Sequence, residues 1–349
     1  MMTEKEYSPK VLVDTADLSE AEWLEWRRKG IGGSDAAAVL GISPFGTARD
    51  LYYDKLNIAT LDGSEENWVQ KQIGHLLEDL VAEIFQKKTG FQIYQMKKMF
   101  CHPQHPFMLA DIDYFVVLPS GEIALLEIKT TNYNAKDHWW KDGKEVVPVN
   151  YEAQGRHYMC VTNLNHVFYC CLYGNSEEEV IIRHIERDLA YEAEMIAVES
   201  EFWNEYVLKK TPPPYTEDGA LVLDSVNRCF GADTNAPAIE LKVPLAGCVL
   251  RFTELQAQKK EIDAQSKKLE NEMKRLQGQI VAEMGASCSA VCSAGGEDYA
   301  ITYNPTIRPM IGKDALMRLQ MQHPEIYQEY VTVSESRRFY VRKSQKAAA

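Results

Sequence analysis

Three side chains of this sequence could act together on one bond: those of Asp113, Glu127 and Lys129. The two acids flank the turn-like segment Pro119-Ser120-Gly121 in a predicted β-hairpin. Both are equally far from residue 120, so antiparallel pairing about that residue sets Asp113 opposite Glu127, with Cβ atoms about 5 Å apart. Lys129 follows Glu127 by two residues, and strand alternation therefore puts both on one face.

Two carboxylates this close repel each other, and a divalent cation between them makes the arrangement favourable. The alternative is the polar outer face of a half-exposed strand. Against it, the strand is apolar on both sides, with Ile123 and Leu125 on the face of Glu127 and, on the other, Ala124, Leu126 and Ile128. Such a strand is buried, and buried charges need partners. The pattern thus favours a metal-assisted site.

The surrounding sequence predicts the elements that position these groups. A capping box at Ser19 and Glu22 opens a helix, Thr47 caps another, and apolar residues repeat at helical spacing over 68–88. Strands are expected at 93–100, 108–118, 122–130, 166–173 and 180–185, and helices at 151–161 and from about 186 to 206. This order predicts an α/β fold with a mixed sheet flanked by helices.

The segment Gly32-Gly33-Ser34 resembles a turn that feeds a helix, with Ser34 as its N-cap and Asp35 in its first turn. Unpaired N–H groups at such a helix start form a ready anion site. A plain capped turn without a ligand is the alternative.

Three regions are expected along the chain: a main domain over 1–210, a polar, irregular linker over 211–247 that begins with three prolines, and a module over 248–349. Heptad spacing in the module predicts a helical hairpin or coiled coil, carried by Leu255, Ile262, Leu269 and Leu276, with Met273 and Ile280. A small α/β piece with the basic run 337–343 follows. A chain ending near residue 210 is expected to retain its activity.

Composition excludes several classes. The chain has 349 residues, 45% of them hydrophobic, and a net charge of -13, so it is neither disordered nor basic overall as many DNA-binding proteins are. A local cationic groove remains compatible with this charge. The eight cysteines contain no CxxC pair, which disfavours a disulfide framework, a zinc ribbon and an iron–sulfur site. No signal peptide or membrane span is apparent, and a cytoplasmic location is expected.

Five motifs in chain order make the sequence similar to the PD-(D/E)xK nucleases, and within them to the YqaJ-type phage exonucleases related to phage lambda exonuclease. The hallmark is an A-x-x-D segment followed by a strand with E-x-K. The motifs are 27–35, Gly74-His75-Leu76-Leu77-Glu78, Ala110-Asp111-Ile112-Asp113, Leu126-Glu127-Ile128-Lys129, and 151–162 with Gln154. The resemblance covers roughly residues 20 to 205 and implies a restriction-endonuclease-like core.

The resemblance implies a Mg²⁺ site, in which Mn²⁺ could substitute, held by Asp113, Glu127, Glu78 and the Ile128 carbonyl. Without it, Glu78 would count as a solvated helix residue. Lys129 would help to orient or deprotonate the attacking water and would offset charge on the phosphate. Asp111 departs from the family pattern, and whether it shares the metal role stays open, although strand parity favours Asp113.

Two further groups would contact DNA. Gln154 and Tyr158 are four residues apart and share a helical face, which would place an amide near the scissile phosphate. An ordinary amphipathic helix is the alternative. The resemblance also implies that Arg27 and the turn at Ser34 receive a DNA phosphate, in particular a terminal 5′ phosphate.

The implied function is metal-dependent hydrolysis of linear double-stranded DNA from its 5′ ends in phage or prophage recombination. A ring-shaped trimer around the DNA and a single-strand annealing protein as partner come with this resemblance, in the cytoplasm of the bacterial host. An endonuclease or nickase on the same core is one alternative. A non-catalytic DNA-binding recombination subunit is another.

Two other motifs offer weaker chemistry. The run Cys101-His102-Pro103-Gln104-His105 holds three soft ligands, but no distant pair completes a zinc site. The run Trp139-Trp140-Lys141 could stack on unpaired bases, or it could pack against the sheet.

Overall fold

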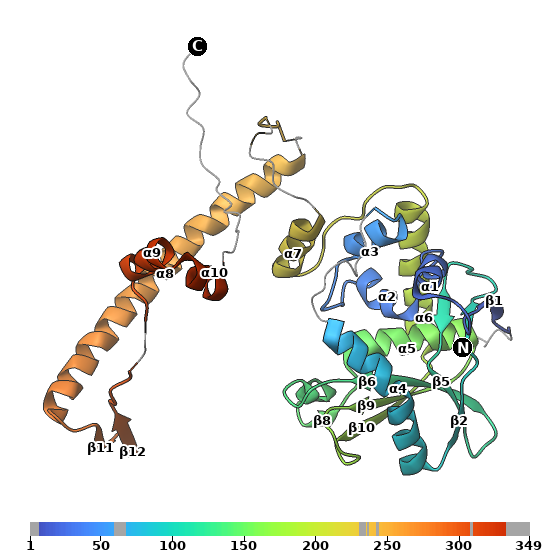
Figure 1. Cartoon of the computed structure of the whole chain (residues 1–349), viewed down its shortest axis with the longest axis horizontal. Coiled ribbons are helices and arrows are strands. Elements are labelled where there is room, and N and C mark those ends of the chain that lie inside the picture. The colour runs from blue at the N-terminus through green and yellow to red at the C-terminus, as the bar shows by residue number, and fades with distance from the viewer. Residues whose placement is uncertain are drawn as a thin grey trace. The chain divides into compact units, whose positions relative to one another are not determined.

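The computed structural model describes residues 7–58, 68–229, 235, 237–241, 244–307 and 310–332. The chain forms two compact units, residues 1–234 and 235–349 (Figure 1). The basic run 337–343 lies outside the described residues.

A five-stranded sheet forms the centre of the first unit, in the order β10-β9-β6-β5-β2 (Figure 1). Strand β6 runs antiparallel to β5 and parallel to β9, so the sheet is mixed, as predicted. The strands are β2 (Gln92–Tyr94), β5 (Tyr114–Val117), β6 (Ile123–Thr130), β9 (His166–Leu172) and β10 (Val180–Glu186). The α/β fold with a mixed sheet flanked by helices is therefore confirmed.

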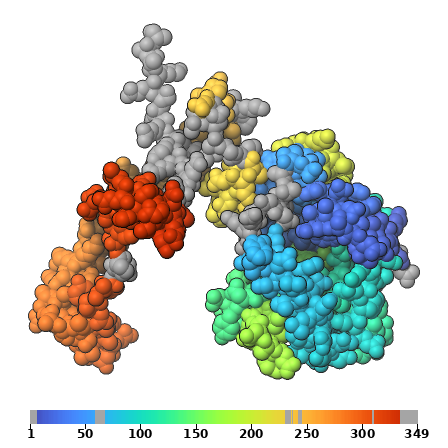
Figure 2. Space-filling model, viewed as in Figure 1, coloured from blue at the N-terminus to red at the C-terminus, as the bar shows by residue number. Residues whose placement is uncertain are grey.

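One helix covers each face of this sheet. Helix α4 (Trp68–Thr89) packs Val81 and Phe85 against the face that contains Leu126, and its outer side lies at the surface of the unit (Figure 2). Helix α5 (Val149–Thr162) covers the opposite face, where the inward residues include Leu125. Glu127 has the parity of Leu125, so the predicted active-site face is the one under α5.

Glycine at residue 155 brings α5 close to the sheet. A Cβ atom there would lie 2.0 Å from the Tyr169 hydroxyl of β9, closer than real atoms approach. That hydroxyl also donates to the Tyr151 carbonyl at 3.0 Å. The contact fixes the height of α5 over the sheet, and with it the neighbouring residue, Gln154.

A second, three-stranded sheet has the order β1-β3-β4, with β1 (Lys10–Asp14), β3 (Lys98–Cys101) and β4 (Leu109–Asp111). The expected continuous strands at 93–100 and 108–118 are therefore wrong. Each is broken because the chain leaves one sheet and enters the other, at 95–97 and at 112–113. The first break contains Lys97 with a positive φ of 44°.

Further helices lie on the α5 side of the sheet (Figure 1). These are α1 (Glu20–Arg27), α2 (Gly33–Val39), α3 (Ala48–Lys55) and α6 (Leu189–Glu201), which continues into a π-helical turn over Phe202–Val207. The connection before α5 contains a 3-10 turn (Lys136–Trp139) and two short strands, β7 (Trp140–Lys141) and β8 (Lys144–Glu145). The capping box predicted at Ser19 is present, and Thr47 caps α3 as predicted.

The predicted irregular linker contains a helix, α7 (Gly219–Cys229), and the expectation for this stretch is wrong. The helix packs against α3 through Asp50, a buried carboxylate that accepts from Ser225 Oγ at 2.7 Å and pairs with Arg228 at 3.0 Å. These partners solvate a charge that burial alone would destabilise. Residues 219–229 therefore belong to the first unit.

The second unit consists of one long helix, a hairpin and two short helices. Helix α8 (Pro244–Met284) spans 41 residues without a break, so the heptads form a single helix and not a helical hairpin. Strands β11 (Ser289–Ala294) and β12 (Glu297–Thr302) pair, and α9 (Lys313–Gln322) and α10 (Pro324–Tyr330) follow, which confirms the small α/β piece. The heptad residues of α8, such as Ile262, are exposed.

All eight cysteines are described, and each has a free thiol. Within the described ranges, no helix combines the length and the apolar content that a membrane span requires.

A chain truncated after residue 234 is expected to fold, whereas one truncated after residue 210 is expected to unfold at lower temperature. The shorter chain removes Ser225 and Arg228 and leaves the buried Asp50 without two of its partners, a loss of about 1–3 kcal/mol. Thermal unfolding followed by circular dichroism measures the difference. Equal melting temperatures for the two truncated chains would show that α7 is dispensable.

Candidate active site

The β5–β6 hairpin has the predicted register. Tyr114 pairs with Leu126, so the next position along the same register sets Asp113 opposite Glu127. Asp113 follows the break after β4, and its Oδ2 accepts from the Ile128 backbone N–H at 2.8 Å. The Asp113 carboxylate thus accepts an N–H that a backbone carbonyl would accept if the ladder continued, and this contact holds it beside β6.

Glu127 is completely buried and only partly satisfied. Its Oε2 accepts from Lys129 Nζ at 2.9 Å and from Gln154 Nε2 at 2.7 Å. Its Oε1 has no hydrogen-bond partner among the described residues. A buried carboxylate oxygen without a donor is costly, and it is the kind of atom that a bound cation would satisfy.

The raised pKa values of the acids also favour a bound cation. Burial, and then the charge of Asp113, raises the pKa of Glu127 although Lys129 opposes the shift. Burial also raises the pKa of Asp113. On α4, burial and the same aspartate raise the pKa of Glu78 to about 7. Burial and mutual repulsion thus disfavour the ionised forms of these acids, and a bound cation would oppose both effects.

These residues fit a hard divalent cation in their chemistry, because they offer carboxylate oxygens and one of these is orphaned. Among the described residues, no three His, Cys, Asp or Glu side chains are already grouped as a metal site. Repulsion between uncompensated carboxylates disfavours such a grouping, so a cation would have to draw them together.

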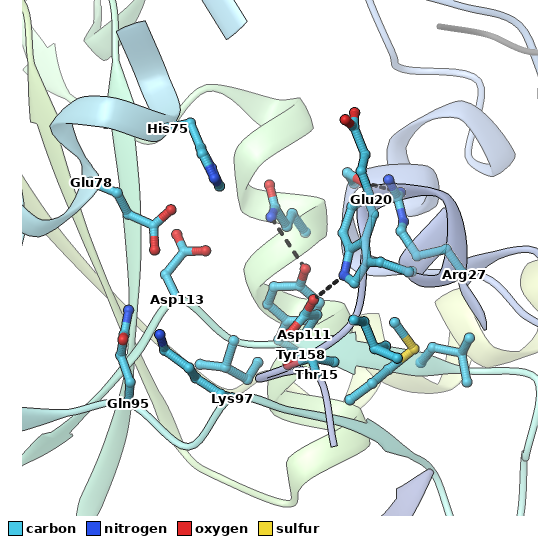
Figure 3. A pocket seen from close by; sticks show the side chains of 18 of the residues that line it. Thr15, Glu20, Arg27, His75, Glu78, Gln95, Lys97, Asp111, Asp113 and Tyr158 are labelled. Carbon is cyan, nitrogen blue, oxygen red and sulfur yellow. Dashed lines mark hydrogen bonds between the residues drawn. The ribbon is translucent and has the colours of Figure 1, made fainter. Parts of the chain in front are cut away.

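The predicted residues meet at a cleft of about 800 Å³. Glu78, Asp113, Gln154 and Tyr158 line it, together with Arg27 and Ser34. Figure 3 shows the carboxylates of Glu78 and Asp113 directed toward each other, away from Arg27. Glu127 does not line the cleft but contacts it through Gln154.

Gln154 and Tyr158 share a face of α5 as predicted, with Gln154 Nε2 3.5 Å from the Tyr158 hydroxyl. Burial raises the pKa of Tyr158 well above its usual value, so this hydroxyl stays protonated. The helices α2 and α5 meet here, because a Cβ on Gly33 would lie 2.4 Å from the Tyr158 ring. Glycine at this position lets α2 approach the tyrosine.

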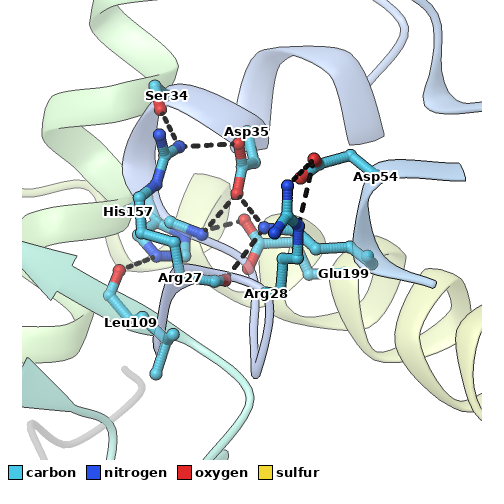
Figure 4. A network of polar contacts seen from close by, with 10 residues as sticks. Arg27, Arg28, Ser34, Asp35, Asp54, Leu109, His157 and Glu199 are labelled. Carbon is cyan, nitrogen blue, oxygen red and sulfur yellow. Dashed lines mark hydrogen bonds and ion pairs between the residues drawn. The ribbon is translucent and has the colours of Figure 1, made fainter. Parts of the chain in front are cut away.

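At the other end of the cleft, Arg27 Nη2 donates to Ser34 Oγ at 2.7 Å and pairs with Asp35 Oδ1 at 3.0 Å (Figure 4). The prediction that Ser34 caps α2 is wrong. Gly32 is the N-cap, and its N–H donates to Asp35 Oδ2 at 2.9 Å. Ser34 lies inside the first turn, where its hydroxyl faces Arg27.

Asp35 and Lys55 form a buried ion pair that supports Arg27. The sequence did not reveal this pair. Lys55 Nζ pairs with Asp35 Oδ2 at 2.7 Å and also donates to the Arg27 carbonyl at 3.0 Å. Burial would raise the pKa of Asp35, but Lys55 and Arg27 lower it to about 2. Lys55 looks like an ordinary helix residue in the sequence, and no spacing connects it to Arg27.

The structure separates the two aspartates of the A-x-x-D segment. Asp111 Oδ2 accepts from Trp23 Nε1 at 2.6 Å, while Asp113 binds the backbone of β6. Asp111 also lines the cleft, but its indole partner lies on α1, on the Arg27 side. The geometry thus agrees with the parity argument for Asp113.

One residue of each weaker motif has a structural role. His102 Nδ1 accepts the backbone N–H groups of Gln104 and His105 at 3.1 and 3.0 Å, which stabilises a turn. Trp139 is buried and stacks on Tyr151, so it packs against the core.

The comparisons with known proteins agree with the motifs. The family model of the YqaJ-like viral recombinase domain matches residues 22–165. The protein YqaJ of Bacillus subtilis (strain 168) is 34% identical over 263 residues, which cover 72% of this chain and 78% of that protein. The chain belongs to the YqaJ-like viral recombinase family.

Two solved structures resemble this YqaJ-like chain. One is LHK-Exo, an alkaline exonuclease from Laribacter hongkongensis, with 21% identity and a TM-score of 0.45 over 55% of this chain and 94% of that one. The other is a phage-related exonuclease from Haemophilus somnus 129PT, with 11% identity and a TM-score of 0.38 over 52% and 96% of the two chains.

A buried histidine on α5, His157, contacts Leu109, which lines the cleft. His157 Nδ1 lies 2.9 Å from Glu199 Oε1, and Nε2 lies 2.9 Å from the Leu109 carbonyl (Figure 4). Both ring nitrogens must donate if both partners accept, so the geometry favours the imidazolium. Burial would lower the pKa of His157, but Glu199 and the Leu109 carbonyl raise it above its ordinary 6.5.

Stability is expected to fall as pH rises through the folded-state pKa of His157. The protonated form is favoured by folding, so its contribution is complete below the unfolded pKa and is lost above the folded one. Chemical denaturation from about pH 6 to about pH 9 should show this fall in wild type and a shallower one in His157→Gln. Parallel curves for the two proteins would contradict a charged His157.

Proposed function

We propose that this YqaJ-like protein is a Mg²⁺-dependent exonuclease that hydrolyses linear double-stranded DNA from its 5′ ends. The observation that carries the proposal is the buried acid cluster of Asp113 and Glu127 beside Lys129, set against a cleft with Arg27 at its far end. Family membership agrees with a role in phage or prophage recombination.

Asp113, Glu127 and Glu78 are the side chains that would hold the cation, with the Ile128 carbonyl as a further oxygen donor. A divalent cation there would polarise the scissile phosphate and make water a better nucleophile near neutral pH. Mn²⁺ accepts the same oxygen donors and would substitute.

Lys129 would offset negative charge at the reacting phosphate. Burial works against its ammonium form, but Glu127 and Asp113 outweigh burial and raise the pKa of Lys129. A side chain that keeps its proton so strongly is a poor general base. We therefore assign it to charge stabilisation and to orienting the water, and not to deprotonating it.

Gln154 would connect Glu127 to the substrate and so help to position the substrate. Its Nε2 already donates to Glu127, and its position on the cleft lets the amide face a phosphate. Tyr158 holds the same amide from the other side and keeps a hydroxyl proton that can be donated.

Arg27 and Ser34 would receive the terminal 5′ phosphate. A guanidinium can bind phosphate through two N–H groups, and the Ser34 hydroxyl lies within reach of the same oxygen atoms. Asp35 and Lys55 hold the arginine from below, so little rotamer freedom is lost when phosphate binds.

A ring-shaped trimer, a single-strand annealing protein as partner and a cytoplasmic location in the bacterial host complete the proposal. A trimer lined with basic groups would reconcile DNA binding with a net charge of -13. An endonuclease or nickase remains the alternative on the same core, and closed circular DNA separates the two because an exonuclease leaves it intact. A non-catalytic DNA-binding subunit would bind linear DNA without degrading it.

Glu127→Gln and Lys129→Ala are each expected to lower Mg²⁺-dependent hydrolysis of linear duplex at least about 100-fold. The first change removes a ligand charge and the second removes the stabilising ammonium. Release of acid-soluble nucleotides measures the rate, and circular dichroism verifies the fold. Near-normal turnover by folded Glu127→Gln protein would refute the site.

Arg27→Ala is expected to lose most of the preference for a 5′-phosphorylated over a 5′-hydroxyl duplex. One charge-assisted contact contributes about 1.5–3 kcal/mol, which corresponds to about 10- to 100-fold in preference. Initial rates on the two duplexes measure it. Lys29→Ala is the control, because Lys29 stacks on Trp26 outside the cleft. Equal rates on both ends with wild type would contradict the pocket and favour the endonuclease.

A further inference from the structure

Lys97 adopts a backbone conformation that lysine seldom takes. Its φ is 44°, in the left-handed region that glycine and asparagine tolerate better. The residue lies where the chain leaves β2 for β3, and two contacts fix it there. The Lys97 carbonyl accepts from the Thr15 N–H at 2.9 Å. The next residue, Lys98, lies opposite Asp14 in the β1–β3 strand pair.

This backbone puts the lysine side chain at the acidic end of the cleft. Lys97 lines the cleft together with Gln95, Glu78 and Asp113. Figure 3 shows its ammonium group on the side where the two carboxylates lie, far from Arg27. Lys97 is exposed and forms no ion pair with any described residue.

Lys97 combines a strained backbone, which the surrounding fold maintains, with a charged side chain in a cleft. Together these two features indicate a contact with a ligand. A glycine at residue 97 would adopt this φ without strain, so the backbone does not require a lysine here. An ammonium group without an ion pair, beside acids that would bind a cation, suits a group of opposite charge that enters with the substrate. For a nucleic acid this group is a backbone phosphate.

We propose that Lys97 binds a backbone phosphate of the DNA strand in the cleft, separate from the phosphate received by Arg27. The inference rests on the proposed function, since it takes DNA as the substrate. It assigns the cleft two cationic contacts, Arg27 at one end and Lys97 at the other, with the acid cluster of Asp113 and Glu78 beside Lys97. Two such contacts would fix the direction in which the strand lies.

Lys97→Asn tests this without disturbing the backbone, because asparagine tolerates positive φ. Binding of a short 5′-phosphorylated duplex to the full chain, measured by fluorescence anisotropy without divalent cation, keeps the DNA intact. Lys97→Asn should bind about 10-fold more weakly at low salt, and the slope of log affinity against log salt should fall by about one unit. Its melting temperature should equal or exceed that of wild type.

Lys97→Arg should restore binding and the slope, because it returns the charge. Lys210→Asn is the matched control: Lys210 also has a positive φ, of 53°, and is exposed outside the cleft. It should leave binding unchanged. Wild-type affinity and slope in folded Lys97→Asn, or an equal loss in Lys210→Asn, would overturn the inference. Failure of wild type to degrade linear DNA in Mg²⁺ would refute the proposed nuclease instead, and this assay does not involve Lys97.

Discussion

The burial of the Glu127 carboxylate is the constraint on which the site depends. Strand β6 is apolar on both faces and lies inside the sheet, yet it carries this acid and Lys129. Lys129 and Gln154 satisfy one oxygen and leave the other without a described donor. A fold selected for stability alone would place an apolar residue there. The cation that we propose for this site would supply the missing partner of that oxygen.

The rest of the first unit positions two helices near that strand: α5 packs against the sheet, and α2 packs against α5. Gly155 lets α5 approach β9 closely enough for Gln154 to reach Glu127, and Gly33 lets α2 approach Tyr158. Since α2 also carries Ser34 and Asp35, the same packing brings the arginine end of the cleft into place. Two glycine contacts thus link the acid cluster to Arg27 through α5.

The sequence was informative where chemistry and periodicity coincide. The hairpin register follows from the symmetric spacing of Asp113 and Glu127 about one turn, and the helix of Glu78 from its apolar repeat. The failures have a common cause in tertiary structure. The break at Lys97 exists because the chain changes sheets, and α7 is held against α3 by contacts with the buried Asp50. Neither a second sheet nor a buried acid on another helix leaves a local pattern, and the same holds for Lys55.

Cation binding measured through stability tests the central claim most directly. A ligand that binds only the folded protein stabilises it by an amount that grows with its concentration, about 2.7 kcal/mol at 100 times the dissociation constant. Thermal unfolding near neutral pH, with increasing Mg²⁺, should raise the melting temperature of wild type and leave that of Glu127→Gln nearly constant. A wild-type melting temperature that does not respond to Mg²⁺ or Mn²⁺, or an equal rise in Glu127→Gln, would contradict the account.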